Sequence, residues 1–534
     1  MTLAPRFLVN LWAGYRLARF RRGLHAAGRG LAGQAAAFAG HMARIAGTEF
    51  GREHSLAATT TYEQFRQRVP PRLHEYFAPR VARMAAGEPD VLAPGRCDFF
   101  VETAGTTGDR PNLLPVPEPM LAHYRRGLRE ALFLYAARAG HTGVFLGRHL
   151  HLGASTEVRQ EGATYRTSLD GMLALCLSPW AEANLYAPPA AIARLPGGAP
   201  KIAAAARALR NRDVSLVGGT PETLRALAAA VRAAAGPGQP PPPHLQAVWP
   251  NLECGAFTGA PLGLAAAGLR DLLGPTVSLH EIYAAAEGMI AAQDEGAAAG
   301  LRLLTEAGLF FEFLPLRQFN EDTLGHAGTD CLPLDRVRTG TDYVLVLTTP
   351  AGLCRHVPGD IVRFVALDPP RLQFAGRTRL QLNSFAERVT ERELLDTMIA
   401  VCARNGWQPV TFHVAPYRHQ VAAGRAFNGH EWWLELRTHT ARTPTANVLG
   451  PELDAELCAR NHTYAALRSG QTLGEPSIRL VVPGVFDQWA DARRQAGGAT
   501  KLPHCRSDRL IADQLAALTR FYQPLESSSP LGGS

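Results

Sequence analysis

The chain has 534 residues, which at roughly 100–200 residues per domain favours several domains over one. Hydrophobic residues make up 46% and charged residues 19%, a balance that indicates a folded globular protein and excludes a disordered or collagen-like chain. The net charge of +8 suits an acidic ligand such as a nucleotide, an acidic substrate, nucleic acid or a membrane surface, and compositional drift explains it equally well.

Lysine is scarce, because of 55 basic residues only Lys201 and Lys501 are lysines. P-loop proteins and protein kinases each need a lysine in a fixed context that neither lysine has, so both classes are excluded. Arginine, with its planar and permanently charged head, is a poor substitute for a compact ammonium. A lysine retained in such a chain therefore hints at chemistry that arginine cannot do, with chance survival as the equal alternative.

The eight cysteines are widely spaced and form no Cys-x-x-Cys pair, which excludes a zinc ribbon and a redox dithiol. We expect reduced, mostly buried thiols in a cytoplasmic protein. No basic run with interleaved aromatics indicates nucleic-acid binding. No stretch approaches the apolar length of a membrane-spanning helix.

The first elements in chain order are helical. We expect a basic N-terminal helix over residues 1–33, in which a short apolar stretch precedes Arg16, Arg19, Arg21 and Arg22, the reverse of a secretory signal. A solvated helix that caps the main domain is the favoured interpretation. The alternative is an amphipathic helix in weak peripheral contact with a membrane surface. Further helices are predicted over 34–47, 62–69 and 79–87.

From about residue 97, strands and helices alternate, which predicts an α/β core with largely parallel, mixed sheets. The predicted elements are strands over 98–103, 214–219 and 277–283, and helices from Pro221, capped by Thr220, and over 262–273. A stiff linker is expected at 236–244. Four closely spaced strands, at 309–316, 343–349, 360–367 and 371–376, predict a smaller antiparallel sheet.

After Gly376 a smaller C-terminal α/β domain is expected. Its predicted elements are a helix over 391–406 with a Thr390–Glu393 capping box, strands over 409–416 and 430–437, a helix over 451–470, a strand over 477–484 and a helix over 485–497. We therefore divide the chain into a large ATP- and acid-binding domain (34–376), a hinge (377–389), a mobile C-terminal domain (390–522) and a disordered tail (523–534).

One short segment has the composition of a phosphate-binding loop. Residues 103–112 read Thr-Ala-Gly-Thr-Thr-Gly-Asp-Arg-Pro-Asn and follow a predicted strand. Glycines let backbone N–H groups close around an anion, and threonine hydroxyls add donors, which suits a polyphosphate. An ordinary Gly/Thr turn is the alternative.

Four further features are weak when taken singly. Tyr283 and Glu287 lie at a strand end, where a tyrosine can stack on a base and a glutamate can hold Mg²⁺. Asp360 follows a Pro-Gly turn and could accept the hydroxyls of a ribose. Gly376-Arg377 marks the domain boundary, and the glycine pair 497–498 precedes Lys501. Each also reads as an ordinary turn, loop or packing residue.

The order of these features resembles the adenylate-forming superfamily. Within it, the chain resembles the acyl-acid amido synthetases, the auxin-responsive Gretchen Hagen family and its bacterial relatives. Matching stretches include VWPNLECGAFTGA (248–260), YVLVLTTPAGLCRHVPGDIVRF (343–364) and LQFAGRTRLQLNSFAERVTEREL (372–394). The resemblance covers about residues 38 to 515.

The resemblance implies a role for each motif. The ATP phosphates would be wrapped by Thr103, Gly105, Thr106, Thr107 and Gly108. Tyr283 would stack on adenine, Glu287 would bind Mg²⁺, and Asp360 would hold the ribose with Arg377 nearby. Lys501 would bridge the carboxylate and the α-phosphate.

The chain departs from the family pattern at several positions. Ala104 replaces a second hydroxyl, Asn112 a basic residue and Ala286 a Ser or Thr, while Arg110 could supply part of the lost charge. Cys354 and His356 replace the aromatics usual around Arg355. These departures motivate one alternative, a non-catalytic nucleotide- or acid-binding descendant.

The resulting prediction is an AMP-forming ligase that adenylates a carboxylic acid with ATP and Mg²⁺ and then joins it to an amine, an amino acid by expectation. The nearest alternative enzyme makes a thioester on coenzyme A from the same adenylate. We expect a monomer that binds no nucleic acid. The pairs His149/His151 and Trp432/Trp433 are interpreted as packing or substrate-wall residues. No hydrolase motif is present.

Overall fold

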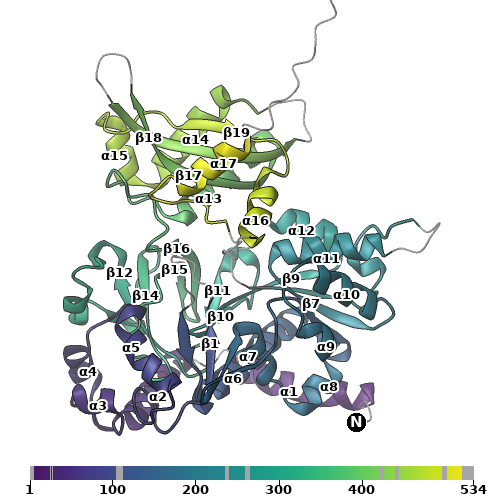
Figure 1. Ribbon diagram of the computed structural model, residues 1–534, viewed down its shortest axis with the longest axis vertical. Coiled ribbons are helices and arrows are strands. Elements are labelled where there is room, and N and C mark those ends of the chain that lie inside the picture. Colours follow the sequence, from purple (N-terminus) through teal and green to yellow (C-terminus); the bar gives the residue numbers. More distant parts are fainter. Residues whose placement is uncertain are drawn as a thin grey trace, which may run out of the picture. The chain divides into compact units, whose positions relative to one another are not determined.

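The computed structural model describes residues 5–24, 26, 28–103, 112–234, 240–258, 265–420, 426–438, 444–495 and 502–519. The chain divides into two compact units, Met1–Phe374 and Ala375–Ser534 (Figure 1). Each unit has its own sheets and its own hydrophobic core.

A mixed twelve-stranded sheet organises the first unit, in the order β13-β12-β14-β15-β16-β11-β10-β9-β8-β7-β3-β6. Its strands are β3 (Arg148–His151), β6 (Tyr186–Ala187), β7 (Val214–Gly219), β8 (Cys254–Thr258), β9 (Ser278–Ala285), β10 (Gly288–Ala292), β11 (Leu301–Leu303), β12 (Phe310–Pro315), β13 (Leu332–Pro333), β14 (Asp342–Thr348), β15 (Asp360–Leu367) and β16 (Pro370–Arg377).

The sheet has a parallel half and an antiparallel half. Strands β6, β3, β7, β8 and β9 pair in parallel. From β9 onward the pairs are antiparallel wherever a register is defined, and β11 joins β16 through Leu301 opposite Leu372. The prediction of a separate small antiparallel sheet was wrong, because this β11–β16 pairing merges the four late strands into the large sheet.

Helices cover both faces of the parallel half, which makes it a three-layer α/β/α arrangement (Figure 1). One face packs against α10 (Ala199–Leu209), α11 (Pro221–Ala233) and α12 (Ala265–Leu273), and the other against α6 (Glu118–Ala139) and α7 (Leu169–Leu175). Thr220 accepts a hydrogen bond from the backbone N–H of Thr223, as its predicted capping role requires.

The remaining elements of the first unit surround this core. They are the helices α1 (Arg6–Leu24), α2 (Arg29–Ile45), α3 (Glu49–Glu53), α4 (Tyr62–Arg68), α5 (His74–Ala85), α8 (Pro179–Asn184) and α9 (Ala190–Ala193), and a four-stranded sheet of β1 (Phe99–Glu102), β2 (Leu113–Pro115), β4 (Arg159–Glu161) and β5 (Thr164–Ser168). The predicted linker at 236–244 falls partly outside the described residues.

The second unit packs helices on a three-stranded sheet. Its elements are β17 (Trp407–Gln420), β18 (Ala426–Thr438), β19 (Ser477–Leu480), α13 (Glu391–Asn405), α14 (Ala446–Arg460), α15 (His462–Ser469), α16 (Val485–Gln495) and α17 (Leu510–Thr519). The Thr390–Glu393 capping box is present. The predicted helix over 451–470 is instead two helices, because the backbone of Asn461 is extended and its side chain caps α15 through the N–H of Tyr464.

All eight cysteines are free thiols, and seven of them are buried. Trp432 and Trp433 are buried in β18, as the packing interpretation predicted. No helix in the described parts of the chain combines the length and the apolar character that a membrane crossing needs.

Candidate active site

The last parallel strand, β9, carries two of the predicted site residues. It pairs in parallel with β8 on one side and antiparallel with β10 on the other. Ligands of α/β sheets collect at the carboxyl ends of parallel strands. Tyr283 lies near this end of β9, and Glu287 lies in the two-residue turn between β9 and β10.

The backbone around Glu287 is held from helix α6. The Tyr124 hydroxyl lies 3.0 Å from the carbonyl oxygen of Ala285 and 2.7 Å from that of Ala286. Burial, followed by the charge of Glu287, raises the pKa of Tyr124, so this phenol stays protonated as a donor. Ala286 therefore contributes its carbonyl group to this contact, and its side chain takes no part in it.

His123 fixes the other side of the same turn. Its Nδ1 lies 2.9 Å from the Ala307 carbonyl oxygen, and the N–H of Met289 donates to its Nε2 over 2.9 Å. Burial lowers the pKa of His123 to about 4, so the neutral ring can donate on one side and accept on the other. Gly288 has φ +149°, and a Cβ there would lie 2.7 Å from the His123 ring.

Tyr283 and Asp360 meet although 77 residues separate them. The Tyr283 hydroxyl donates to Asp360 Oδ2 over 2.6 Å. In a flat sheet, four strand spacings would place β9 and β15 about 19 Å apart. The bond therefore requires the sheet to curl, which brings the start of β15 over the end of β9. The ring of Phe374 packs edge-on against Tyr283, with the centroids 5.7 Å apart.

Asp360 is the first residue of β15 and is buried. The turn before it has Gly359 at φ +90°, a conformation that favours glycine. The predicted Pro-Gly-Asp turn thus places one carboxylate beside the Tyr283 hydroxyl.

Of the predicted phosphate-binding loop, the structure describes only the two ends, Thr103 and Asn112. Thr103 donates its N–H to the Asn112 carbonyl oxygen over 2.9 Å, and Asn112 donates its own to Thr103 Oγ1 over 3.2 Å. These bonds close the base of the segment. The remaining candidates lie outside the described residues: Ala104, Gly105, Thr106, Thr107, Gly108 and Arg110.

Two further predicted residues, Arg377 and Lys501, lie near and beyond the hinge. Arg377 is the last residue of β16 and belongs to the second unit. Lys501 lies outside the described residues. Their roles, and the hinge itself, stay predictions.

A cluster that the sequence analysis did not assemble lies at the end of β3. His151 Nε2 is 2.7 Å from Asp170 Oδ1, and Asp170 Oδ2 accepts the N–H of Ala154 over 2.7 Å. Burial alone would raise the pKa of Asp170, but its bonds to His151 and Ala154 and the charge of Lys201 outweigh this and hold it below its usual value. His149, by contrast, is a packing residue whose Nε2 lies 2.8 Å from the Val144 carbonyl oxygen.

Lys201, in α10, is buried and points its ammonium at three backbone carbonyls. Its Nζ donates to Ala154 over 2.6 Å, to Ala193 over 2.8 Å and to Gly153 over 3.3 Å. An ammonium has three donors on one compact atom, which a planar guanidinium cannot imitate. The scarcity of lysine was the sequence signal that could have pointed to this cluster. At Lys201, lysine is needed to hold three backbone carbonyls, which is a structural role.

The described residues contain no group of three or more His, Cys, Asp or Glu side chains arranged to hold a metal ion. One carboxylate in the right place nevertheless fits Mg²⁺, which keeps several waters and uses one or two carboxylates with substrate phosphates. Glu287, in a turn fixed by Tyr124 and His123, is compatible with that donor set.

Known proteins resemble this chain along most of its length. The GH3 family N-terminal domain matches residues 30–196, the GH3 family central domain residues 302–377, and the GH3 family C-terminal domain residues 392–510. The indole-3-acetic acid-amido synthetase GH3.8 of Oryza sativa subsp. indica is 29% identical over 210 residues, which are 37% of this chain and 33% of that protein. GH3.4 of Arabidopsis thaliana, with the same activity in its name, is 27% identical over 213 residues, 37% of this chain and 34% of its own length.

These matches thus span about a third of each of the two curated relatives. Among solved structures, the AtGH3.15 acyl acid amido synthetase in complex with 2,4-DB has a TM-score of 0.72 at 17% identity and covers 97% of both chains. A 2-hydroxyisobutyryl-CoA ligase with bound 2-HIB-AMP has a TM-score of 0.56 at 15% identity, covering 92% of this chain and 93% of that one. Both likenesses show that the chain shares its fold with these two proteins. Because the three family domains together match more than half of the sequence in their expected order, the chain belongs to the GH3 family.

Proposed function

We propose that the chain is an AMP-forming ligase that makes an amide from a carboxylic acid and an amine. In the first half-reaction, a carboxylate oxygen attacks the α-phosphorus of ATP, giving an acyl adenylate and pyrophosphate. In the second, an amine attacks the acyl carbon, AMP leaves, and the amine loses a proton. An amino acid is the proposed amine.

The Tyr283–Asp360 contact carries this proposal. It places a phenol ring and a buried carboxylate side by side at the end of β9, beside the turn that holds Glu287. The ring offers a face on which adenine can stack, and the carboxylate can accept ribose hydroxyls. We assign Tyr283 to the base and Asp360 to the ribose, with Arg377 close to the same nucleotide.

Glu287 is the proposed ligand for Mg²⁺, which would neutralise charge on the phosphates when bound. Thr103, Gly105, Thr106, Thr107 and Gly108 are assigned to the phosphates through backbone and hydroxyl donors. Lys501 would place a compact ammonium between the substrate carboxylate and the α-phosphate. Rotation of residues 390–522 about the hinge at 377–389 would admit Lys501 in one orientation only.

The proposed partners are a small carboxylic acid and an amino acid, for a cytoplasmic monomer that binds no nucleic acid. Indole-3-acetic acid stands in the names of the curated relatives, and 2,4-DB is bound in the AtGH3.15 structure. Carboxylic acids of these two kinds are therefore the first substrates to test. Weak peripheral contact with a membrane through the N-terminal helix is proposed as well.

The experiment is a pyrophosphate-release screen of carboxylic acids crossed with amino acids and with coenzyme A. We expect release that depends on an acid and on ATP, with an amide as the product. If pyrophosphate is released and the product is a thioester, the second substrate is coenzyme A and not an amine. ATP binding without pyrophosphate release for any acid would contradict the enzyme and favour a nucleotide-binding descendant.

Variants of Lys501 test whether the two half-reactions depend on different residues. Lys501→Ala should slow pyrophosphate release by about 100-fold, the scale of losing a pre-placed donor, and leave amide formation from a supplied acyl adenylate nearly normal. Lys501→Arg should rescue poorly. If both half-reactions fall equally, Lys501 is not the adenylation residue.

A further inference from the structure

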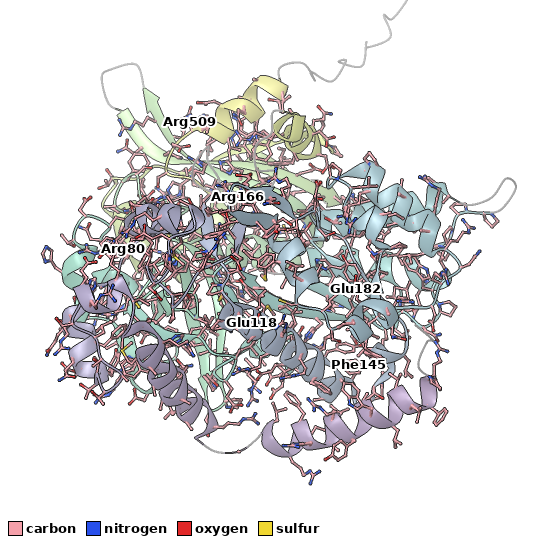
Figure 2. All side chains as sticks on the ribbon, turned by 60° about the horizontal axis from the view of Figure 1, so that its bottom comes forward. Arg80, Glu118, Phe145, Arg166, Glu182 and Arg509 are labelled. Atoms are coloured by element: carbon pink, nitrogen blue, oxygen red, sulfur yellow. The ribbon has the colours of Figure 1, made fainter. Side chains whose placement is uncertain are left out.

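The N-terminal helix α1 has apolar side chains on two different faces. The inward face packs on the hydrophobic core of the first unit through Val9, Ala13, Leu17, Phe20 and Leu24. This packing anchors the helix, so its other face has a defined direction. In Figure 2, α1 runs along the lower edge of the first unit below Phe145, and side chains on it project away from the molecule.

The outward face exposes large apolar side chains. The exposed fractions are 70% for Phe7, 48% for Leu8, 71% for Leu11, 48% for Trp12 and 61% for Tyr15. At 100° per residue these five positions fall within an arc of about 140°. Trp12 also meets Trp180 of α8, with the ring centroids 6.2 Å apart. A soluble surface rarely gathers such side chains without a partner.

Positive charge is concentrated in the same part of the chain. Residues 1–48 contain seven arginines and no Asp or Glu, so they carry +7 of the net charge of +8. The other 486 residues carry 48 basic and 47 acidic side chains and are close to neutral.

Four of the five arginines of α1 form two groups, and the fifth, Arg16, lies over the ring of Trp12. Arg6 pairs with Asp213, and Arg21 donates to the Ala137 carbonyl oxygen, so both bind the protein body. Arg19 and Arg22 are exposed, and helical spacing places them on the same outward arc, one to two turns after Tyr15. The outward face is therefore apolar in its N-terminal half and basic in its C-terminal half.

We propose that this outward face of α1, from Phe7 to Arg22, docks on the surface of a bilayer that contains anionic phospholipids. Phe7, Leu8 and Leu11 enter the boundary between headgroups and acyl chains, and Trp12 and Tyr15 take the interfacial position that aromatic side chains prefer. Arg19 and Arg22 meet the lipid phosphates. The inward face keeps its contacts with the core, so the helix lies on the membrane without crossing it.

Charge and side-chain chemistry select this occupant over two others. Helix α1 has five arginines and no Asp or Glu, so two copies that face each other through it repel, which disfavours self-association. Nucleic acid could stack on the rings of this face, but the Phe7–Tyr15 half of the outward arc carries no arginine to follow the phosphates, and Leu8 and Leu11 would stay exposed to water. This inference rests on α1 alone and does not depend on the proposed ligase activity.

The test is co-sedimentation of the full-length protein with vesicles of equal parts phosphatidylserine and phosphatidylcholine, compared with pure phosphatidylcholine. Binding should favour the anionic vesicles and weaken at high salt. Leu11→Ser/Trp12→Ser should weaken binding about tenfold or more. Arg19→Gln/Arg22→Gln should weaken it about fivefold for each arginine.

Matched controls come from exposed residues elsewhere in the first unit. Leu367→Ser removes a leucine that is 48% exposed, and Arg317→Gln/Arg336→Gln removes two exposed arginines. We expect all variants to keep the wild-type melting temperature and these controls to bind vesicles normally.

Three outcomes would overturn the proposal. The first is equal binding to neutral and anionic vesicles, or none to either. The second is a loss of vesicle binding in the control variants as large as in the α1 variants. The third is a concentration-dependent dimer, seen by light scattering without lipid, that Leu11→Ser/Trp12→Ser abolishes.

Discussion

Two buried carboxylates in the large sheet accept a hydrogen bond from a tyrosine, yet they lie in different surroundings. Glu312 lies inside β12, where Tyr62 donates to it over 2.9 Å and Arg355 Nε donates over 2.9 Å. Asp360 lies at the start of β15, where Tyr283 donates to it over 2.6 Å. The first carboxylate is paired with a guanidinium in the core, and the second opens a strand beside the proposed nucleotide site.

The remaining donors of Arg355 go to backbone carbonyls. Nη1 donates to Val69 over 2.7 Å and to Arg66 over 3.1 Å, and Nη2 donates to Gly328 over 2.7 Å. This buried arginine therefore ties α4 and the residue after it to β12 and to the segment Leu324–Thr329. The comparison shows that similar pairs of residue types occur both within a strand of the core and at the start of a strand beside the proposed site.

The structural role of Arg355 explains where one departure from the family pattern acts. Cys354 and His356, which replace aromatics, flank Arg355 and are buried. Burial lowers the pKa of His356 to about 3, and its ring packs edge-on against Phe77 with the centroids 5.7 Å apart. We therefore infer that these two replacements affect the packing of the core and do not touch the nucleotide.

Breaking the Glu312–Arg355 pair should have the largest effect. Arg355→Met leaves Glu312 buried without its guanidinium, which should lower the free energy of unfolding by about 3–5 kcal/mol. Urea unfolding measures this loss. The double variant Glu312→Leu/Arg355→Met should recover part of it, because no uncompensated charge is left. A stability loss below about 1 kcal/mol would contradict the structural role of the pair.

Lys201 tests whether a second buried cation is equally structural. Lys201→Arg cannot direct three donors from one atom at the carbonyls of Gly153, Ala154 and Ala193, and its larger head must also be accommodated. We expect the free energy of unfolding to fall by about 2–3 kcal/mol. Lys201→Met, which has similar length and no charge, should be no better. Wild-type stability in Lys201→Arg would make the retention of lysine here a matter of chance.

Asp360→Ala probes the other side of the comparison. If Asp360 accepts the ribose hydroxyls, its removal deletes charge-assisted hydrogen bonds worth about 1.5–3 kcal/mol, and the affinity for ATP should fall tenfold or more. Calorimetric titration with ATP measures this. Urea unfolding should change by less than for Arg355→Met. Unaltered ATP affinity would remove Asp360 from the site.

Removing one hydroxyl from Tyr283 or from Tyr62 should have the smallest effect of the four comparisons. Tyr283→Phe keeps the ring but loses the hydroxyl that orients Asp360, so ATP binding should weaken by about 0.5–1.5 kcal/mol. Tyr62→Phe removes the corresponding hydroxyl from Glu312. It should lower stability by a similar amount and leave ATP affinity unchanged. Equal effects of both variants on ATP binding would erase the distinction between core and site.

The sequence predicted those elements whose signals are local. Strand β7 and the capped starts of α11 and α13 follow from apolar runs and capping residues a few positions apart. The merging of the antiparallel strands into one sheet could not be predicted, because it depends on the β11–β16 pairing across about seventy residues. The helical pattern over 451–470 likewise runs through Asn461, whose side chain instead competes with that helix by capping the next one.

In the candidate site, too, local signals were predictable from the sequence and contacts between distant segments were not. Tyr283 and Asp360 were each weak signals in sequence, and their contact depends on the curl of the sheet, which no short motif encodes. The Lys201 cluster was missed because it joins three helices, the end of a strand and the loop after it. The phosphate-loop residues and Lys501 stay predictions from the resemblance.

The turn at Ala286-Glu287 also fixes how the chain length can vary. Strand β10, which follows it, is buried along both faces: Met289 packs with α6 in one core, and Ile290 packs in the other. Helix α6 approaches so closely at Gly127 that a Cβ there would lie 2.5 Å from Met289. One deleted residue in the turn would bring Ile290 to the place of Met289 and press a β-branched side chain against α6, and one inserted residue would bring Gly288 there and leave that place without a side chain. Insertions and deletions should therefore be tolerated in the surface loops but not at this hairpin, where the number of residues matters more than their identity.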